Sequence, residues 1–272
     1  MHHLEPPPPN PVNPPVNPAA DRHYGSDILQ GLRLPPTGRI LDLGCGAGHL
    51  TARLATLVPR GTVLGTDPDP DMVAAARLRS TDRQVSFEVC RPQDVPALAG
   101  RQRFDLVVSR AALHHIPAAE HPDVLAAVFS VLRPGGTFRA EFGGAGQIAA
   151  VQRILDEEAA GAGGRTAPWF FPGPEDYRPL LLAAGFQVSP DGWVCLLHRR
   201  MPVGSETELV GWLRGEVLLA YEAGLPAGAV PAFRGRAEER AIDELRRPDG
   251  SFDLDFVRLD LSAARPKAES LI

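Results

Sequence analysis

Short apolar runs alternate with amphipathic stretches through the first half of the chain. Continuous apolar runs of about five residues are typical of strands that are buried on both faces. The intervening stretches repeat apolar residues every three or four positions, as one face of a helix does. The predicted strands are 39–43, 62–66, 85–89, 104–109 and 137–142, and the predicted helices are 48–58, 69–79 and one with its apolar stripe at 124–132. This alternation predicts an α/β fold whose parallel sheet has helices on both faces.

The second half of the chain has a less regular pattern. Its predicted helices are 147–158, 174–184, 205–223 and 230–247, and its predicted short strands are 186–188 and 193–197. In the last segment, 252–263, apolar residues alternate with polar ones, but the phase of the alternation changes between Phe256 and Val257. Such a change predicts one strand with a bulge at that point.

Composition narrows the classes of protein. The chain has 272 residues, which suffices for one large domain, and a net charge of −5, which gives no reason to expect nucleic-acid or anionic-membrane partners. No apolar run approaches the roughly 20 residues of a membrane span. Residues 1–20 contain eight prolines, which predicts a disordered tail.

The three cysteines are widely spaced and form neither a disulfide framework nor a metal-ligand pair, so we expect no metal site. Residues 1–9 lack the apolar segment of a secretory signal. We therefore expect a reducing, cytoplasmic location.

The first predicted strand ends in an acid and a glycine-rich loop. Asp42 is followed by Gly44, Gly46 and Gly48, where the backbone can turn sharply and lie against a ligand. A dinucleotide-binding loop would need a glycine at the position of His49. Because Asp42 would repel a pyrophosphate but attract a cationic amino group, the loop favours a ligand with an α-amino group, and a nicotinamide oxidoreductase is disfavoured.

A second acid, Asp67, ends the next predicted strand. A carboxylate at this place can accept hydrogen bonds from both hydroxyls of a ribose. The two acids together predict a ligand that carries an amino group and a ribose but no phosphate.

Five motifs now resemble, in order, those of class I S-adenosylmethionine-dependent methyltransferases. They are 42–48 (DLGCGAG), 65–69 (GTDPD), 104–109 (FDLVVS), 113–116 (LHHI) and 132–136 (LRPGG). The resemblance implies a Rossmann-like, seven-stranded, mostly parallel sheet whose last strand is antiparallel, a place that 252–263 would fill. It also implies S-adenosyl-L-methionine as the cofactor.

The downstream half is similar to the trans-aconitate methyltransferase group. The similarity rests on 169–172 (WFFP), 177–186 and 249–259. It implies that the helices 205–223 and 230–247 help to cover the substrate. We therefore expect one domain over 21–272, with a cofactor half at 21–142 and a half at 143–272 that covers the substrate.

The resemblance also assigns cofactor contacts. The three glycines would pass beneath the methionine part of the cofactor, while Asp42 would hold its amino group and Asp67 its ribose. Arg91 stands where the family usually has an acid that reaches the adenine amine, and arginine has no acceptor for that amine. Gln93 or Asp94 would take its place. The expected cofactor-binding residues are Asp42, Gly44, Cys45, Gly46, Gly48, Asp67, Pro68, Gln93, Asp94 and Ser109.

His114 and His115 follow the fourth predicted strand, at the edge where parallel sheets bind ligands. A histidine there can serve as the general base for a hydroxyl or amine acceptor, or it can be structural. Which of the two faces the site stays open. Tyr24 lies in the N-terminal segment that often closes over the cofactor in this family, and it is a further candidate catalytic residue that could contact the cofactor or the acceptor.

These observations predict a methyltransferase of secondary metabolism that acts on a small-molecule acceptor, with O-methylation favoured. Methylation at carbon or nitrogen stays open, and so does a non-catalytic protein that binds the cofactor, because Arg91 departs from the family pattern. We expect no nucleic-acid or membrane partner. The acceptor and the oligomeric state, with a homodimer among the alternatives, are open.

Overall fold

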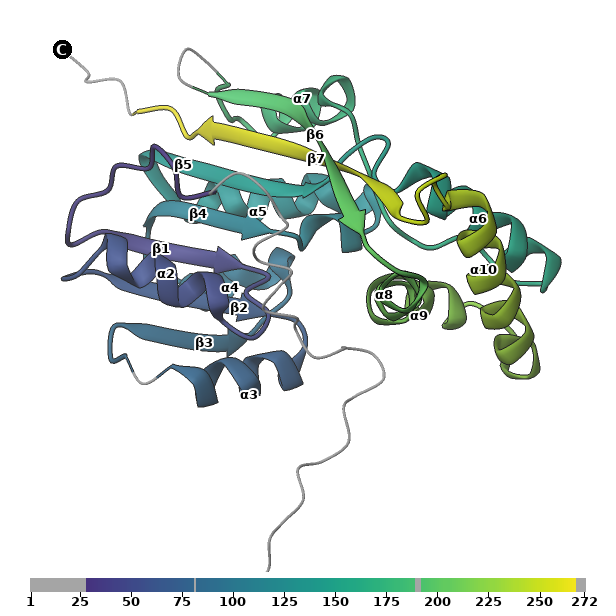
Figure 1. The fold of residues 1–272 in the computed structure, drawn as a ribbon. Helices are drawn as coiled ribbons and strands as arrows, with labels where there is room; N and C mark the ends of the chain where they lie inside the picture. The colour runs from purple at the N-terminus through teal and green to yellow at the C-terminus, as the bar shows by residue number, and fades with distance from the viewer. Residues whose placement is uncertain (1–27, 81, 189–191, 268–272) are drawn as a thin grey trace, which may run out of the picture. The chain divides into compact units, whose positions relative to one another are not determined.

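The computed structural model describes residues 28–80, 82–188 and 192–267, and it contains a seven-stranded sheet in the order β3-β2-β1-β4-β5-β7-β6 (Figure 1). The pairs β1–β2, β1–β4, β2–β3 and β4–β5 are parallel, whereas β5–β7 is antiparallel, as predicted. The strands are β1 (Arg39–Leu43), β2 (Thr62–Asp67), β3 (Val85–Val89), β4 (Phe104–Arg110), β5 (Leu132–Gly143), β6 (Trp193–Val203) and β7 (Phe252–Ala264). The predicted tail 1–20 lies outside the described residues.

The chain divides into two compact units. The sheet unit comprises Ser26–Gln147, Trp169–His198 and Val257–Ile272, and the helical unit comprises Ile148–Pro168 and Arg199–Phe256, together with residues 1–25, which are not described. The boundaries fall within β6 and β7. Buried apolar side chains occur in both units, such as Leu41 and Phe138 in the sheet unit and Ile154 and Phe233 in the helical unit.

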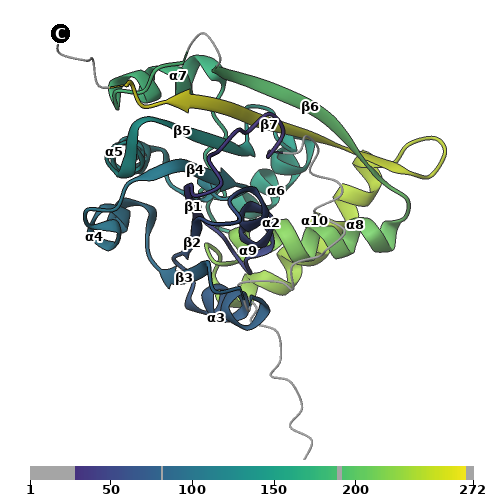
Figure 2. The same cartoon turned by 90° about the vertical axis from the view of Figure 1, so that its left-hand side faces the viewer.

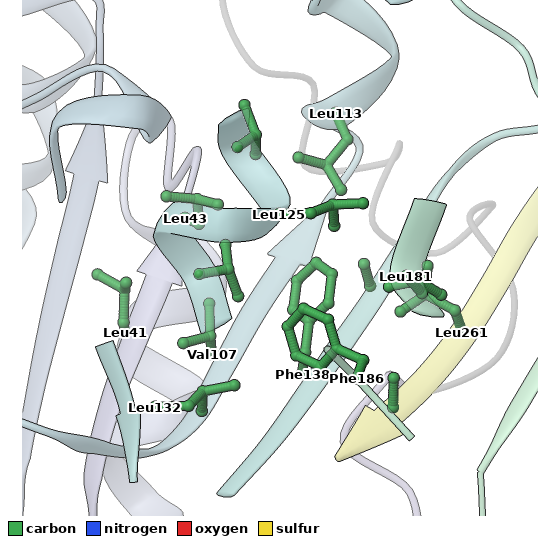
Figure 3. Close-up of a cluster of buried hydrophobic side chains, with 14 of the residues drawn as sticks. Leu41, Leu43, Val107, Leu113, Leu125, Leu132, Phe138, Leu181, Phe186 and Leu261 are labelled. Carbon is green, nitrogen blue, oxygen red and sulfur yellow. The ribbon is translucent and has the colours of Figure 1, made fainter. Parts of the chain in front are cut away.

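Helices cover both faces of the sheet unit (Figure 2). On one face, α2 (His49–Leu57) packs against β1 and β2, and α3 (Pro70–Arg79) packs against Phe87 of β3. The other face carries the largest core (Figure 3), in which Leu41, Val107 and Phe138 pack against α4, α5 and α7. These three helices are α4 (Val95–Ala99), α5 (His121–Val131) and α7 (Pro174–Ala183). The predicted α/β fold with helices on both faces is confirmed.

The face of the sheet on which α2 packs carries charged residues in its part formed by β5 and β7. Arg139 and Glu141 alternate with the core residues of β5, and Asp260 lies directly opposite Glu141 on β7. All three are buried. Arg139 forms a buried ion pair with Asp260 and donates to the carbonyl of Leu261 at 2.8 Å.

The helical unit contains a break that the sequence did not predict. The predicted helix 205–223 is divided into three consecutive elements in the structure. They are α8 (Glu206–Trp212), a π-helical turn η4 (Leu213–Val217) and α9 (Leu218–Glu222). Its apolar residues, from Leu209 to Tyr221, recur every four positions and are all buried. A four-residue repeat drifts by about 40° per step on an α-helix with 3.6 residues per turn. The wider π turn absorbs this drift and keeps the stripe on one face.

The remaining helices of this unit are joined by ion pairs. Arg240 of α10 (Val230–Leu245) reaches Glu157 at 2.7 Å and Glu158 at 2.9 Å, both on α6 (Ala149–Gly161). Tyr221 donates to Asp156 of α6 at 2.6 Å. No helix within the described ranges combines the length and the apolarity that a membrane crossing needs.

Two sequence expectations differ from the structure, and a third is not reached by the ladder that could test it. The predicted strand 186–188 is only an isolated bridge, in which Gln187 and Ala264 exchange two backbone hydrogen bonds of 2.9 Å. β5 begins at Leu132, before the predicted 137. The ladder between β7 and β5 has a continuous register and covers only 258–264 of β7. It ends before Phe256 and Val257, so the bulge at that point stays a prediction.

Removing the carboxylate of the buried ion pair tests its part in stability. We expect Asp260→Ala to lower the free energy of unfolding by about 3 kcal/mol or more, because it leaves the Arg139 charge buried without this partner. Urea unfolding measures the change. The control is Glu206→Gln, which breaks an exposed ion pair with Arg246 and should cost less than about 1 kcal/mol. Equal losses in the two variants would contradict the assignment.

Candidate functional site

The loop between β1 and α2 depends on its three glycines. Gly44, Gly46 and Gly48 have φ values of 76°, 51° and 81°, in the left-handed region that favours glycine. A Cβ on Gly44 would lie 2.3 Å from the Cβ of Ala112, in the loop after β4. A Cβ on Gly46 would meet no atom within 4 Å. At Gly44 the loop therefore packs closely against the segment that follows β4, whereas at Gly46 it leaves space for a ligand.

Asp42 lies at the base of this loop and is buried. Its Oδ2 accepts a hydrogen bond of 2.6 Å from the hydroxyl of Thr51, one turn into α2. Its Oδ1 has no partner among the described residues. Burial raises the pKa of this carboxyl from 3.8 to about 7, with the hydrogen bond from Thr51 acting in the opposite direction. Oδ1 is therefore an acceptor that a bound ammonium group would satisfy.

Asp67 ends β2 and holds the neighbouring backbone. Its two carboxylate oxygens accept from the amide of Gly46 at 2.9 Å and from that of Asp69 at 3.0 Å. Burial raises its pKa. Each oxygen keeps lone pairs for further donors, so the carboxylate can still accept from ribose hydroxyls. Pro68, beside it, is exposed.

Two of the expected cofactor residues have structural partners. The Cys45 side chain is buried with Val73 and Phe87, and burial raises the pKa of its thiol, so it is a packing residue and not a nucleophile. The Ser109 hydroxyl donates to the carbonyl of Leu43 at 2.8 Å and so ties the end of β4 to the end of β1. Their contact with a cofactor stays a prediction.

The segment after β3 shows where Arg91 points. Its guanidinium forms an ion pair of 3.2 Å with Glu120, in the short helix η3 (Ala118–Glu120). The side-chain amide of Gln93 donates to the same carboxylate, and Oε1 of Gln93 is buried with no partner among the described residues. Asp94 ends the turn η1 (Pro92–Asp94) and is exposed. Gln93 thus offers the acceptor that Arg91 lacks.

The histidine pair lies on the turn η2 (Leu113–His115), which follows a strained residue, Ala111, with φ of 55°. The two rings are 4.1 Å apart, and His114 is half-buried whereas His115 is exposed. The amide of Gly143 donates to Nδ1 of His114 at 3.4 Å. Since Nδ1 accepts, the proton of the neutral ring is on Nε2.

The surroundings keep both histidines neutral. Burial holds the pKa of His114 well below 6.5, and the neighbouring His115 and Arg258 act in the same direction because both disfavour a further positive charge there. Neighbouring protein atoms that shield the His115 ring from water, followed by the charge of Arg258, lower the pKa of His115 as well, although part of the residue is exposed. His114 therefore presents an N–H donor through Nε2, and a lone pair for general-base chemistry would have to come from His115. Tyr24, the third candidate, lies outside the described residues.

Sequence reasoning missed two charged residues of the site, Arg258 near the histidines and Arg110 near Asp42. Arg258 of β7 is buried and lies opposite Gly143 in the β5–β7 register. Arg110, which directly follows Ser109, pairs in register with Glu141, and its charge lowers the pKa of Asp42. The position of Arg110 at the end of a strand could have indicated it. Arg258 depends on pairing between distant segments, so no local signal indicates it.

The geometry fits a nucleoside that carries an amino acid. The unpartnered Oδ1 of Asp42 suits an ammonium group, the open face of Gly46 suits an aliphatic chain, and Asp67 suits a ribose. All of these groups lie at the carboxyl ends of parallel strands, where such folds bind ligands. Together the fold and the site define a Rossmann-like enzyme that uses a nucleoside cofactor.

Comparisons with known proteins narrow the class. The family described as a methyltransferase domain matches residues 40–136. The chain is 30% identical, over 92% of its length and 98% of the relative's, to a trans-aconitate 2-methyltransferase of Variovorax paradoxus. It is 30% identical, over 87% of its length and 89% of the relative's, to the enzyme of that name from Mycobacterium tuberculosis. The chain belongs to the S-adenosylmethionine-dependent methyltransferases, and S-adenosyl-L-methionine is its cofactor.

Solved structures agree on the fold. A putative methyltransferase from Bacillus halodurans has a TM-score of 0.60 at 18% identity, with 89% of this chain and all of that chain covered. The YcgJ protein from Bacillus subtilis has a TM-score of 0.61 at 16% identity, with 89% and 97% covered. The expected seven-stranded, mostly parallel sheet of this class is confirmed.

The raised pKa of Asp42 predicts a pH dependence of cofactor binding. Below a pKa of about 7 the free carboxyl holds a proton that must leave before it can attract the cofactor's ammonium group. The affinity for S-adenosylhomocysteine should therefore rise by up to about tenfold per pH unit between pH 5.5 and 7. Titration calorimetry in two buffers of different ionisation heat would show protons released on binding. Asp42→Asn should bind weakly and release none; a pH-independent affinity of the unaltered protein would contradict the prediction.

Proposed function

We propose that this enzyme methylates a carboxylate oxygen of a small anionic acceptor and so forms a methyl ester. The observation that carries the proposal is the pairing of a neutral His114, with its proton on Nε2, and the buried cation Arg258. An N–H donor and a guanidinium bind a carboxylate, whereas neither can remove a proton from a hydroxyl.

The charged residues on the neighbouring strands support an acceptor that is an anion. On the face that carries Glu141, the described residues of β4, β5 and β7 include three arginines, Arg110, Arg139 and Arg258, and two carboxylates, Glu141 and Asp260. On these three strands the arginines outnumber the carboxylates by one, and Asp42, on the same face of β1, has a pKa raised to about 7. The names of the relatives point the same way, since trans-aconitate is an anion with carboxylate groups.

The chemistry needs little from the protein beyond binding and alignment. When bound, S-adenosyl-L-methionine supplies a methyl group on a sulfonium, and transfer to a carboxylate oxygen breaks one carbon–sulfur bond, leaves S-adenosylhomocysteine and moves no proton. Asp42 would hold the ammonium group, Asp67 the ribose and Gln93 the adenine amine. His114 and Arg258 would orient the acceptor and exclude water from it.

One observation favours a second function. His115 is exposed and its pKa is lowered, so its neutral ring could serve as the base for a phenol or an amine. The two functions differ in their products. A methyl ester releases methanol in alkali, whereas a methyl ether or a methylamine does not.

Binding of S-adenosylhomocysteine tests the cofactor site. We expect Asp67→Ala to weaken it by about tenfold to a hundredfold, because hydrogen bonds to a charged group are worth about 1.5–3 kcal/mol. Calorimetry measures the affinity, with NAD as the ligand that should not bind. The control is Asp82→Ala, since Asp82 also accepts from a backbone amide two residues on, that of Gln84, but is exposed outside the site. Equal affinities of the two variants would contradict the role of Asp67.

Methyl transfer tests the acceptor class. With cofactor labelled in the methyl group, trans-aconitate should yield a product whose label alkali releases as methanol. Arg258→Met should lower kcat/KM by about tenfold to a hundredfold, because it removes a charged hydrogen-bond donor. Arg200→Met is the control, since Arg200 is exposed and pairs with Asp253. An alkali-stable product from a neutral acceptor, unaffected by Arg258→Met, would overturn the ester proposal and favour the base.

A further inference from the structure

His121 and Tyr177 form a buried polar pair beneath the histidine turn of the sheet unit. His121 is the first residue of α5, Tyr177 belongs to α7, and both side chains are fully buried. Nδ1 of His121 lies 3.0 Å from the Tyr177 hydroxyl. Its Nε2 lies 3.2 Å from the carbonyl of Ile116, the residue that ends the turn η2. The pair thus links α7 to the segment that carries His114 and His115.

The partners of His121 fix where its protons lie. A carbonyl can only accept, so Nε2 carries the ring proton and donates to Ile116. Nδ1 must then accept from the Tyr177 hydroxyl. Burial raises the pKa of Tyr177 and lowers that of His121, so the phenol keeps its proton and the ring stays neutral. The result is a directed chain of hydrogen bonds from Tyr177 through His121 to the backbone of the turn.

The same cluster also fixes His114. The amide of Phe170 donates to the carbonyl of His114 at 3.0 Å, and the Phe170 ring packs edge-on against His121 with centroids 4.8 Å apart. Gly143 donates to the His114 ring, and its neighbour Phe142 packs edge-on against Tyr177 at 5.2 Å. Phe170 bonds to the His114 backbone and packs against His121. Gly143 bonds to the His114 ring, and its neighbour Phe142 packs against Tyr177. The contacts of His114 therefore depend on the packing of the His121–Tyr177 pair.

We propose that Tyr177 and His121 are positioning residues: their hydrogen-bond chain to Ile116 holds the turn so that His114 keeps its ring proton on Nε2, directed at the acceptor. The inference rests on the proposed function in one respect, that the turn borders the acceptor. Neither side chain touches a reacting group. Without the chain, the turn can shift, the bond from Gly143 to the His114 ring weakens, and the ring exchanges between its two tautomers.

The test is nitrogen-15 NMR of the folded protein, which distinguishes the tautomers of each histidine without an acceptor. We expect His114 to be fixed in the Nε2–H form, and Tyr177→Phe, which removes only the hydroxyl, to give a mixture of both forms. Amide hydrogen exchange at residues 113–116 should also accelerate, by about tenfold or more. His121→Gln is the second variant, because its side-chain amide can still donate to Ile116 and should keep His114 fixed.

The matched control is Tyr221→Phe, which removes another buried tyrosine hydroxyl, bonded to Asp156 in the helical unit. Both tyrosine variants should lower the melting temperature, but only Tyr177→Phe should change the His114 tautomer. An unchanged His114 in Tyr177→Phe, or a mixture already present in the unaltered protein, would overturn the proposal. S-adenosylhomocysteine should bind all of these proteins equally; its failure to bind the unaltered protein would count against the proposed function and not against the positioning pair.

Discussion

The close approach of the glycine loop to the chain after β4 is the constraint on which the rest of the site depends. Any side chain on Gly44 would occupy the place of the Ala112 methyl group. Because these two segments touch, the end of β1, which carries Asp42, and the turn that carries His114 are fixed against each other. The cofactor side and the acceptor side of the site are therefore parts of one packed arrangement, and the strained Ala111 is the backbone feature that completes it.

Much of this arrangement could be predicted from the sequence because it is local. The strand ends at Asp42 and Asp67 and the glycine spacing lie within short segments, and the structure places them together as expected. Burial and pKa are not local. The sequence gives no indication that Oδ1 of Asp42 lacks a partner, since that follows from how Thr51 and the sheet enclose it.

The features that prediction missed depend on distant pairing. Arg258 reaches the site only through the antiparallel register of β7, and the tautomer of His114 depends on an amide of β5. The break in the helix 205–223 was missed for a different reason. A stripe of apolar residues at a spacing of four was interpreted as α-helical, although the strict spacing itself favours a wider turn.

The antiparallel place of β7 also has a consequence for folding. β5 lies between β4 and β7, so it has an unpaired edge until β7 arrives, and Thr137 pairs with Ala264 across most of the second half of the chain. Closing so long a loop is slow because its entropy is lost before the contacts form. The helices of the helical unit, α6 and α8 to α10, are synthesised before β7, the strand that covers this edge. During synthesis, the β5 edge is therefore open to pairing with another chain until β7 covers it.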